Sequence, residues 1–578
     1  MKKKQILVLV LAFAVFISST LLACAIGKSN GVTREDVSFY TDDGVNLTGT
    51  LYIPATATAE TPAAGIVVAP GGNTPSIFYA SYQIELARRG YVVFTYNYYG
   101  TLGSDYTTEG SSGAVAAMKY LSGLGFVDSS RLGATGHSNG GAQAFAAISS
   151  EPGMAAEKRS VVFIGCGIST TDTAQLENLN VMAIWGKLDE CGQGVFWDTY
   201  SADSPSYPTF AESAGITNEE VEPGKIYGSA DNNSVRVVYT PNTFHSLSNI
   251  AGSSVQNICD YFDLTLEGNT TGVSNMIYGW EELAVLLMAV SLCVMIFPVG
   301  RLLLETELFS SLKRAIPEAH EKCTFMNWLF ILVPGILSAL IVKSTIIQGQ
   351  TLMNKLPKLF STQSTSGFVW WFFLSTLIAI VFYVIHLFVD KSIDRKAEVS
   401  RLKINCIDLI KAVFFGILTV GVPYICAVFA QRMTGWYGRI FQTYLAALAN
   451  RQRLWQYFVY FILFAILFIR ASYMQADLRF KNVNPVCEYL ITLLDNALPA
   501  VLFLGVLYGQ LILTHVTPIN GREMSRAQGA MMGMLLLYFV IAKSVRYFYK
   551  KTGNIYVAAM VNAAFVTWLS VNTPQVII

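Results

Sequence analysis

Six consecutive residues, Gly136-His137-Ser138-Asn139-Gly140-Gly141, place a hydroxyl between glycines two positions before it and two positions after it. Such glycines permit the tight strand-to-helix turn that holds a nucleophilic serine exposed. A β-rich stretch, Leu132 to Gly136, precedes the serine, and an Ala-rich stretch, Ala142 to Ser149, follows it. We therefore expect Ser138 to be the nucleophile of an acyl-transfer reaction, with the N–H of Asn139 free to stabilise an oxyanion.

A serine nucleophile needs a base, and the chain offers few. Between residues 28 and 275 the only histidines are His137 and His245. His137 is too close to Ser138 along the turn to accept its proton, whereas His245 lies just past the last expected strand. Elimination and position therefore both favour His245 as the base.

An acid must orient that base, and in folds with this turn it lies between the serine and the histidine along the chain. Asp189 meets this condition in Trp185-Gly-Lys-Leu-Asp-Glu190, just past an apolar strand. Glu190 is a rival, but we expect its side chain to point away along the turn. The predicted triad is therefore Ser138, Asp189 and His245.

The oxyanion requires a second N–H donor from the loop after the third strand. The run Val67-Val-Ala-Pro-Gly71-Gly72-Asn73 provides a Gly-rich turn there, so Gly72 or Asn73 is the expected donor. This chemistry requires no metal or organic cofactor. The nine cysteines also lack any CxxC or Cys/His spacing that would indicate a metal site.

Short β-rich runs alternate with helix-like stretches from Val37 to Phe262, which predicts an α/β domain with a mostly parallel eight-stranded sheet. The expected strands are Val37 to Tyr40, Leu47 to Tyr52, Gly65 to Ala69, Tyr91 to Tyr96, Leu132 to Gly136, Val161 to Ile164, Val181 to Trp185 and Val235 to Tyr239.

With its serine turn and ordered acid and histidine, the stretch from Val37 to Leu266, about 40% of the chain, resembles the α/β-hydrolase superfamily. The likeness is to its dienelactone-hydrolase-like and esterase/lipase branch. It implies acyl transfer to Ser138 and then to water, oriented by the triad. Pro70 departs from the pattern, because many members have a histidine before the glycine of the oxyanion loop.

Two further features of this stretch each have two interpretations. The segment between Asp189 and the last strand holds six aromatic residues, which form either a lid over an apolar acyl group or ordinary packing; they are Phe196, Trp197, Tyr200, Tyr207, Phe210 and Tyr227. Cys166 and Cys191 follow neighbouring strands, so a disulfide between them is geometrically plausible outside the cell.

Charge is distributed very unevenly along the 578 residues, of which 53% are hydrophobic and 14% charged. Residues 28–275 hold 11 basic and 25 acidic residues, a net charge of −14, whereas the remainder carries +15. An acidic, water-exposed part beside a basic membrane part explains this division, and it argues against a nucleic-acid partner.

The chain begins with Met1-Lys-Lys-Lys4 and an apolar run from Ile6 to Leu22, which is typical of an export signal. Three fates are compatible with it: lipid attachment at the lipobox-like Leu21-Leu22-Ala23-Cys24, cleavage at Ala23-Cys24-Ala25, or retention as an anchor. We divide the chain into this signal or anchor at 1–27, an extracytoplasmic hydrolase domain at 35–266, a linker at 267–278 and a membrane domain at 279–578.

Eight apolar runs of near-spanning length follow the linker. They lie at Glu281 to Leu303, Thr324 to Val342, Phe368 to Val389, Leu409 to Ala430, Trp455 to Ile469, Val486 to Leu513, Gly529 to Ala542 and Ile555 to Val571, the seventh being short. If the acidic domain is outside the cell, the inner connections hold 16 Lys and Arg against 9 in the outer ones. This bias agrees with the export signal and predicts a multi-pass plasma-membrane protein, bacterial by analogy.

Most ionisable residues of these runs lie near their ends, but Asp495 lies well inside the sixth, with Asn496 and Pro499. We interpret it as a buried helix contact, with a substrate path as the second interpretation. The last run, Lys551-Thr-Gly-Asn-Ile555 to Asn562, faintly resembles the final motif of the membrane-embedded CAAX-protease-like family. Asn562 replaces a histidine there, and Glu281-Glu282 lacks the arginine, which implies that such protease activity is lost.

Two functions of different classes follow. The first is a membrane-tethered extracytoplasmic serine hydrolase that cleaves small-molecule or lipid esters, with apolar acyl groups favoured. The second is a multi-span transporter or sensor that carries a hydrolase-like binding module. The complete triad and the lack of a recognisable transport motif favour the first. The residues are compatible with hydrolysis and with transfer to another alcohol.

Overall fold

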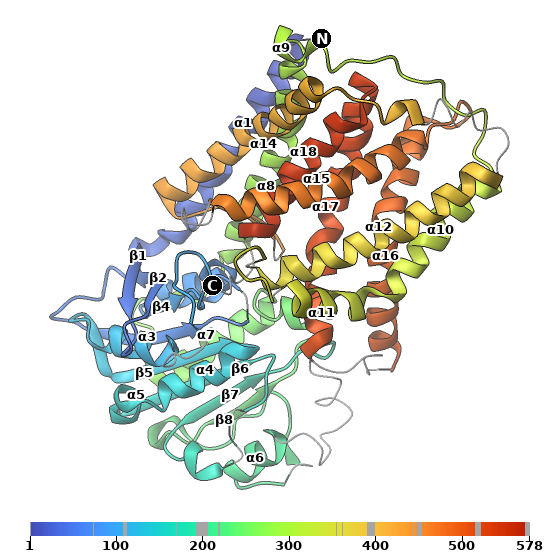
Figure 1. Ribbon diagram of the computed structural model, residues 1–578. Coiled ribbons are helices and arrows are strands. Elements are labelled where there is room, and N and C mark those ends of the chain that lie inside the picture. Colours follow the sequence, from blue (N-terminus) through green and yellow to red (C-terminus); the bar gives the residue numbers. More distant parts are fainter. Residues whose placement is uncertain are drawn as a thin grey trace. The chain divides into compact units, whose positions relative to one another are not determined.

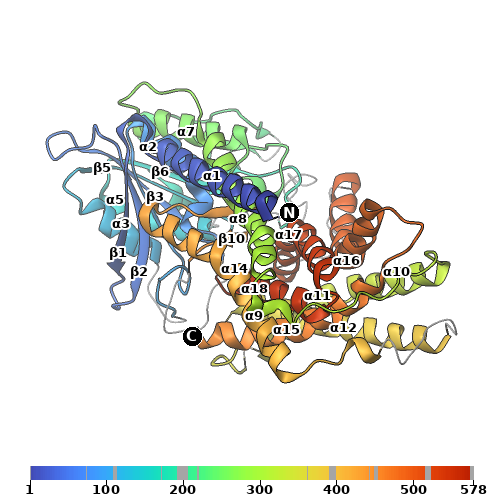
Figure 2. The same ribbon diagram turned by 90° about the horizontal axis from the view of Figure 1, so that it is seen from above.

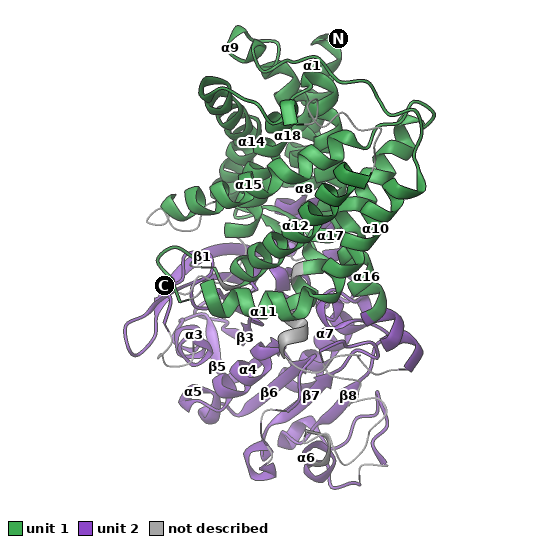
Figure 3. Ribbon diagram, turned by 45° about the vertical axis from the view of Figure 1, so that its right-hand side comes forward, with its two compact units in different colours: residues 1–20, 285–506, 526–574 green, residues 21–284, 507–525, 575–578 purple. Residues whose placement is uncertain are grey.

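The computed structural model describes residues 2–72, 74–107, 113–168, 170, 172–191, 206–217, 220–353, 355–360, 362–389, 399–441, 443–447, 454–514 and 522–572. The chain divides into two compact units, coloured separately in Figure 3. The first, here called the helical unit, comprises residues 1–20, 285–506 and 526–574. The second, here called the sheet unit, comprises residues 21–284, 507–525 and 575–578.

The sheet unit is built on one eight-stranded sheet, with the strand order β1-β2-β4-β3-β5-β6-β7-β8 (Figure 1). All eight expected strands are present: β1 (Thr33–Tyr40), β2 (Asn46–Ile53), β3 (Ala63–Ala69), β4 (Val92–Tyr96), β5 (Val127–His137), β6 (Lys158–Ile164), β7 (Asn180–Ile184) and β8 (Arg236–Tyr239). β2 pairs antiparallel with β1 and with β4, and every other pair is parallel. The predicted mostly parallel sheet is confirmed.

Helices cover both faces of this sheet, which is why the central residues of its parallel strands are mostly apolar. Helices α3 (Gly113–Ser122) and α4 (Asn139–Ile148) pack on one face, and α2 (Ala80–Arg89) and α7 (Gly252–Leu266) pack on the other (Figure 2). Residues of β3, β4 and β6 such as Val67, Phe94 and Phe163 are fully buried in the resulting core. This packing holds the carboxyl ends of β3, β5, β6, β7 and β8 in a rigid row.

The helical unit is formed mainly of long apolar helices. The long elements are α1 (Lys2–Gly27), α8 (Tyr278–Leu303), α12 (Gln363–Val389), α14 (Cys406–Thr434), α15 (Leu454–Asp477), α16 (Pro485–Thr514) and α17 (Arg522–Thr552). Over the described residues, seven helices are long and apolar enough to cross a membrane, or eight if one bent pair counts as a single span. These helices are compatible with a multi-pass membrane protein.

Each of the eight predicted apolar runs corresponds to a helix, with three differences. The second run, Thr324 to Val342, is α10 (Phe325–Leu340), and it is followed by a helix that we did not predict, α11 (Val342–Met353), at a bend of 60°. The seventh, expected to be short, lies in the 31-residue α17. The eighth, α18 (Ile555–Asn572), is short but packs against α14 and α15, where a Cβ on Gly416 would lie 2.5 Å from the carbonyl oxygen of Met560.

Candidate active site

Ser138 occupies the sharp turn between the end of β5 and the start of α4, as expected. Its backbone has a positive φ of 55° with ψ −124°, a conformation that a non-glycine residue adopts only under constraint. The glycines on either side are sterically required. A Cβ on Gly136 would lie 2.0 Å from the carbonyl oxygen of Gly140, and a Cβ on Gly140 would lie 2.3 Å from that of Ala69.

Asp189 and His245 meet beyond the carboxyl ends of β7 and β8. The Oδ2 atom of Asp189 lies 2.8 Å from Nδ1 of His245, and both residues are buried. The other carboxylate oxygen of Asp189 accepts a hydrogen bond from the N–H of Cys191 at 2.9 Å. The acid is therefore held from two sides and presents one oxygen to the imidazole.

The imidazole of His245 is a strengthened base. Burial alone lowers the pKa of His245, but the Asp189 carboxylate at Nδ1 and the neighbouring Cys191 side chain together outweigh burial, and the net pKa is well above its ordinary value. The pKa of His137, whose ring lies tilted against that of His245 at a centroid distance of 4.5 Å, is shifted in the opposite direction. Its burial, reinforced by His245, lowers the pKa of His137 far below its ordinary value. Of the two rings, only that of His245 faces a carboxylate that stabilises its protonated form.

Glu190 does not point away from the site, contrary to our expectation. Its buried carboxylate accepts the main-chain N–H of His245 at 2.9 Å, and burial followed by the charge of Asp189 raises the pKa of Glu190. His137 supports the same segment from the other side, because its Nε2 lies 3.0 Å from the carbonyl oxygen of His245. Asp189 thus contacts the ring of His245, whereas Glu190 and His137 position its backbone.

Cys166 and Cys191 are free thiols, so the disulfide that we considered plausible is absent. The two side chains have different neighbours. Cys166 lies over α4, where a Cβ on Gly141 would be 2.1 Å from its sulfur, and burial raises the pKa of Cys166 to about 12. Cys191 instead lies beside the acid and the base, and atoms of Asp189, Cys191 and His245 that could hold a metal lie within 4.8 Å of one another.

This trio is the one place among the described residues where three such groups gather. Its carboxylate and imidazole already hydrogen-bond to each other, the arrangement of a base with its orienting acid. Burial raises the pKa of the Cys191 thiol, which favours its neutral form beside the imidazole. The group therefore fits proton transfer better than metal binding.

The expected oxyanion loop lies beside the serine turn. A Cβ on Gly72 would lie 2.9 Å from the Nδ2 atom of Asn139, so the two expected donors Gly72 and Asn139 are neighbours. The alternative donor, Asn73, lies outside the described residues. Tyr79 anchors the loop, because its hydroxyl accepts the N–H of Gly71 at 2.6 Å. Asn139 begins α4, and the N–H groups of a first helical turn have no partner within the helix.

The structure does not show contacts among all of the predicted site residues that it describes. No hydrogen bond from the Ser138 hydroxyl to His245 is recorded in the described part of the chain, and such contacts are often long before substrate binds. Of the six aromatic residues after Asp189, Phe196, Trp197 and Tyr200 lie outside the described residues, as does the side chain of Tyr207. Phe210 is 1% exposed and belongs to the core, and Tyr227 donates its hydroxyl to the carbonyl of Glu220.

Gly165 is a site residue that our sequence reasoning missed. It follows β6 with φ +59°, and a Cβ there would lie 3.0 Å from Nδ1 of His245 and 3.2 Å from Oδ2 of Asp189. Only a glycine leaves room for the acid and base to approach each other at this point. The sequence signal that could have identified this glycine is the pair Gly165-Cys166 directly after a buried strand.

No family model matches the chain. The bis(hydroxyethyl) terephthalate hydrolase of Streptomyces coelicolor is 37% identical over 112 residues, which is 19% of this chain and 35% of that protein. The chain thus spans about a third of the length of this curated relative.

Solved structures similar to the chain include three hydrolases. A dienelactone hydrolase-like promiscuous phosphotriesterase from metagenomic libraries is 17% identical, with a TM-score of 0.29 and coverage of 40% of this chain and 98% of that one. An esterase of Pyrococcus furiosus has 14% identity, a TM-score of 0.30 and coverage of 41% and 94%. A bacterial brefeldin A esterase has 14% identity, a TM-score of 0.28 and coverage of 44% and 85%.

Four features of the sheet unit occur together in a single known architecture. They are the strand order, the antiparallel second strand, the strained serine turn after β5, and an acid and a histidine beyond β7 and β8. The segment from Thr33 to Leu266 therefore has the α/β-hydrolase fold, and dienelactone hydrolase-like and esterase proteins are among the structures it resembles.

Proposed function

We propose that this chain is a membrane-tethered serine hydrolase that cleaves esters outside the cytoplasm. The observation that carries the proposal is the 2.8 Å contact between Asp189 and His245, at the same sheet edge as a serine with φ 55°. A carboxylate that orients a buried imidazole and a nucleophile on a strained turn are the parts that acyl transfer needs.

In the proposed reaction, the His245 ring nitrogen not bound to Asp189 takes the Ser138 proton as Oγ bonds to the ester carbonyl carbon. The N–H groups of Asn139 and Gly72 stabilise the resulting oxyanion. His245 then gives its proton to the leaving alcohol as the carbon–oxygen bond breaks, leaving an acyl-serine. Water repeats the sequence, releasing the carboxylic acid and restoring Ser138.

Esters of apolar or aromatic acids are the proposed substrates. The Streptomyces relative is named as a hydrolase of bis(hydroxyethyl) terephthalate, an aromatic ester. That match covers only part of each protein, so a series of benzoate, butyrate and acetate esters is the appropriate first screen. We expect the benzoate and butyrate esters to react faster than the acetate.

The distribution of charge supports the proposed extracytoplasmic location. The lysines at the start of α1 and the excess of Lys and Arg in alternate connections both favour an outward-facing hydrolase domain at 35–266. The segment 279–578 would then hold it at the membrane.

A membrane-impermeant fluorophosphonate probe, applied to intact cells, tests nucleophile and location together. We expect the wild-type protein to be labelled and Ser138→Ala, at equal expression, to show no labelling, because the probe needs an activated serine. Labelling only after lysis would contradict the proposed location. No labelling in either case would contradict the hydrolase and favour a transporter or sensor that carries a non-catalytic module.

A further inference from the structure

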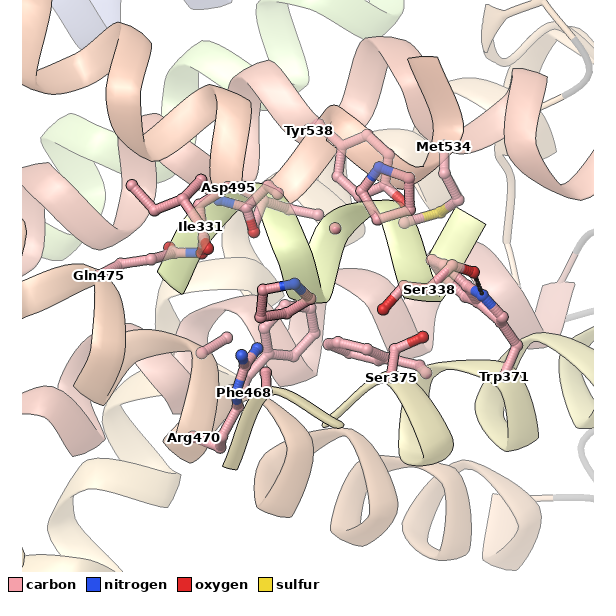
Figure 4. A pocket seen from close by; sticks show the side chains of 18 of the residues that line it. Ile331, Ser338, Trp371, Ser375, Phe468, Arg470, Gln475, Asp495, Met534 and Tyr538 are labelled. Carbon is pink, nitrogen blue, oxygen red and sulfur yellow. Dashed lines mark hydrogen bonds between the residues drawn. The ribbon is translucent and has the colours of Figure 1, made fainter. Parts of the chain in front are cut away.

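A cavity with a few polar groups in a mostly apolar wall lies in the helical unit, in a part of the molecule that the proposed hydrolysis does not use. Its volume is about 60 Å³, and α10, α12, α15, α16 and α17 line it (Figure 4). A cavity needs about 10–15 Å³ to hold one water molecule. This cavity therefore has room for a few waters or for a molecule of a few heavy atoms. Most of its wall is apolar and aromatic, including Phe368, Trp371 and Phe468.

Arg470 is the one basic side chain of this cavity wall, and the carboxylate of Asp495, also on the wall, is the group whose charge acts on it. No carboxylate of the described residues lies within ion-pair distance of its guanidinium, and its buried Nε has no hydrogen-bond partner. An arginine remains charged in any protein environment, and an unpaired cation among apolar helices is costly. This cation is therefore complementary to an anion within the cavity.

Asp495 supplies the opposite charge on another helix. One of its carboxylate oxygens accepts a hydrogen bond from Nε2 of Gln475 at 3.0 Å. Gln475 is 1% exposed, and its own Oε1 has no partner. Figure 4 shows Arg470 and Asp495 directed toward the same space from different helices, with Gln475 beside Asp495. The cavity wall thus offers both a cation and hydrogen-bond acceptors.

The backbone adds one more acceptor at the Asp495 end. Pro499 lies inside α16 and also lines the cavity. Because proline has no N–H, the carbonyl of Asp495, four residues earlier, lacks its helical donor. Ser375 and Tyr538, also on the wall, have hydroxyls without partners, and Tyr538 is only 6% exposed.

Close packing gives this cavity a defined shape. A Cβ on Gly335 would lie 2.5 Å from Cδ2 of Leu498, so α10 and α16 touch directly beside it. The indole N–H of Trp371 donates to the carbonyl of Ser338 at 3.0 Å, which joins α12 to α10. The unpartnered polar groups are therefore held in place by packed helices.

We propose that this cavity binds a small carboxylate that also carries a hydrogen-bond donor, either the hydroxyl of a hydroxy acid or the ammonium of an amino acid. The carboxylate pairs with the guanidinium of Arg470, for which a planar two-oxygen group is the best geometric match. The donor group binds the acceptors at Asp495 and Gln475. The binding does not depend on hydrolysis by Ser138, so the two proposals stand or fall separately.

Binding is measured on the full-length protein in lipid nanodiscs by saturation-transfer NMR, with four probes of similar size. Lactate and alanine carry a carboxylate and a donor, propionate lacks the donor, and 2-propanol lacks the carboxylate. We expect lactate or alanine to bind at least about tenfold more tightly than propionate, and 2-propanol not to bind. The better of the first two shows which donor the site prefers.

Variants locate that binding. Arg470→Gln is expected to weaken the preferred probe at least about tenfold, whereas Arg432→Gln, an exposed arginine of α14 away from the cavity, leaves it unchanged. Asp495→Asn should reduce affinity for lactate or alanine but not for propionate, a pattern that general loosening of the helices would not produce. A single gel-filtration peak controls for folding.

Three results would overturn the proposal. They are no binding of any probe, as for a cavity that holds only water; equal binding of propionate and of the probes with a donor; or equal affinity in Arg470→Gln and the wild type. If Arg470→Gln fails to fold, the probe series on the wild type and on Asp495→Asn still decides.

Discussion

The two units contain similar buried ionisable groups but arrange them in different ways. In the sheet unit, Asp189 and His245 pair at 2.8 Å, and the acid also receives the N–H of Cys191. In the helical unit, Arg470 and Asp495 line one cavity without an ion pair between them. The Asp189–His245 contact suits the proposed proton transfer. The separated charges of Arg470 and Asp495, which face a cavity, suit the proposed binding of a ligand. The comparison teaches that the spacing of charged groups, more than their type, indicates function.

The largest expected effect is on the paired acid. Asp189→Asn should lower kcat/KM for an ester by about 10⁴-fold, because the imidazole loses the group that orients it and stabilises its charge. Steady-state kinetics on purified full-length protein measure the loss. Glu190→Gln is the matched control, since that carboxylate contacts the main-chain N–H of His245 and not its ring. A larger loss in Glu190→Gln than in Asp189→Asn would reverse the two roles.

The next effect concerns backbone packing in the two units. Gly136→Ala places a methyl group 2.0 Å from a carbonyl oxygen and should destabilise the sheet unit by about 3 kcal/mol or more. Gly421→Ala in α14 has nothing within 4 Å and should leave stability unchanged or raise it by about 0.5 kcal/mol. Thermal unfolding in one detergent compares them. Equal unfolding temperatures for the two variants would contradict the steric argument at the serine turn.

The pH dependence tests the strengthened base. Only neutral His245 can accept the Ser138 proton, and its pKa is raised well above the ordinary value near 6.5. Activity should therefore rise with pH, and the midpoint of kcat/KM should lie above 6.5. Asp189→Asn removes the raising charge, so the residual activity should have a lower midpoint. A wild-type midpoint below 6.5 would show that burial outweighs the carboxylate.

The smallest effect is expected at Cys191. Alanine there keeps the main-chain N–H that Asp189 accepts, so Cys191→Ala should change kcat/KM by no more than about threefold. The same kinetic assay checks this. A loss of about a hundredfold would instead give the thiol a part in the reaction. Such a result would weaken the contrast between the Asp189–His245 pair, which we describe as complete, and the separated charges of Arg470 and Asp495.

Much of the sheet unit could be predicted from local sequence. Each of the eight strands has its own apolar run between turns, and a serine between glycines is visible wherever such a turn occurs. The long apolar helices are equally local, because length and composition define them. Helix α11, which lies beyond the bend, could not be predicted in this way, because the apolar run ends at Val342 and Lys343, Ser344 and Thr345 follow it.

The sequence by itself determined the order of elements and the residue types at the strand ends, because periodicity and turn residues act over a few positions. Only the tertiary structure decided that Asp189 contacts the ring while Glu190 contacts the backbone, that the thiols of Cys166 and Cys191 stay apart, and that Gly165 leaves room for His245. It also decided that Arg470 and Asp495 face one cavity. These outcomes depend on distances between segments far apart along the chain, and such distances are set by packing and not by local residue pattern.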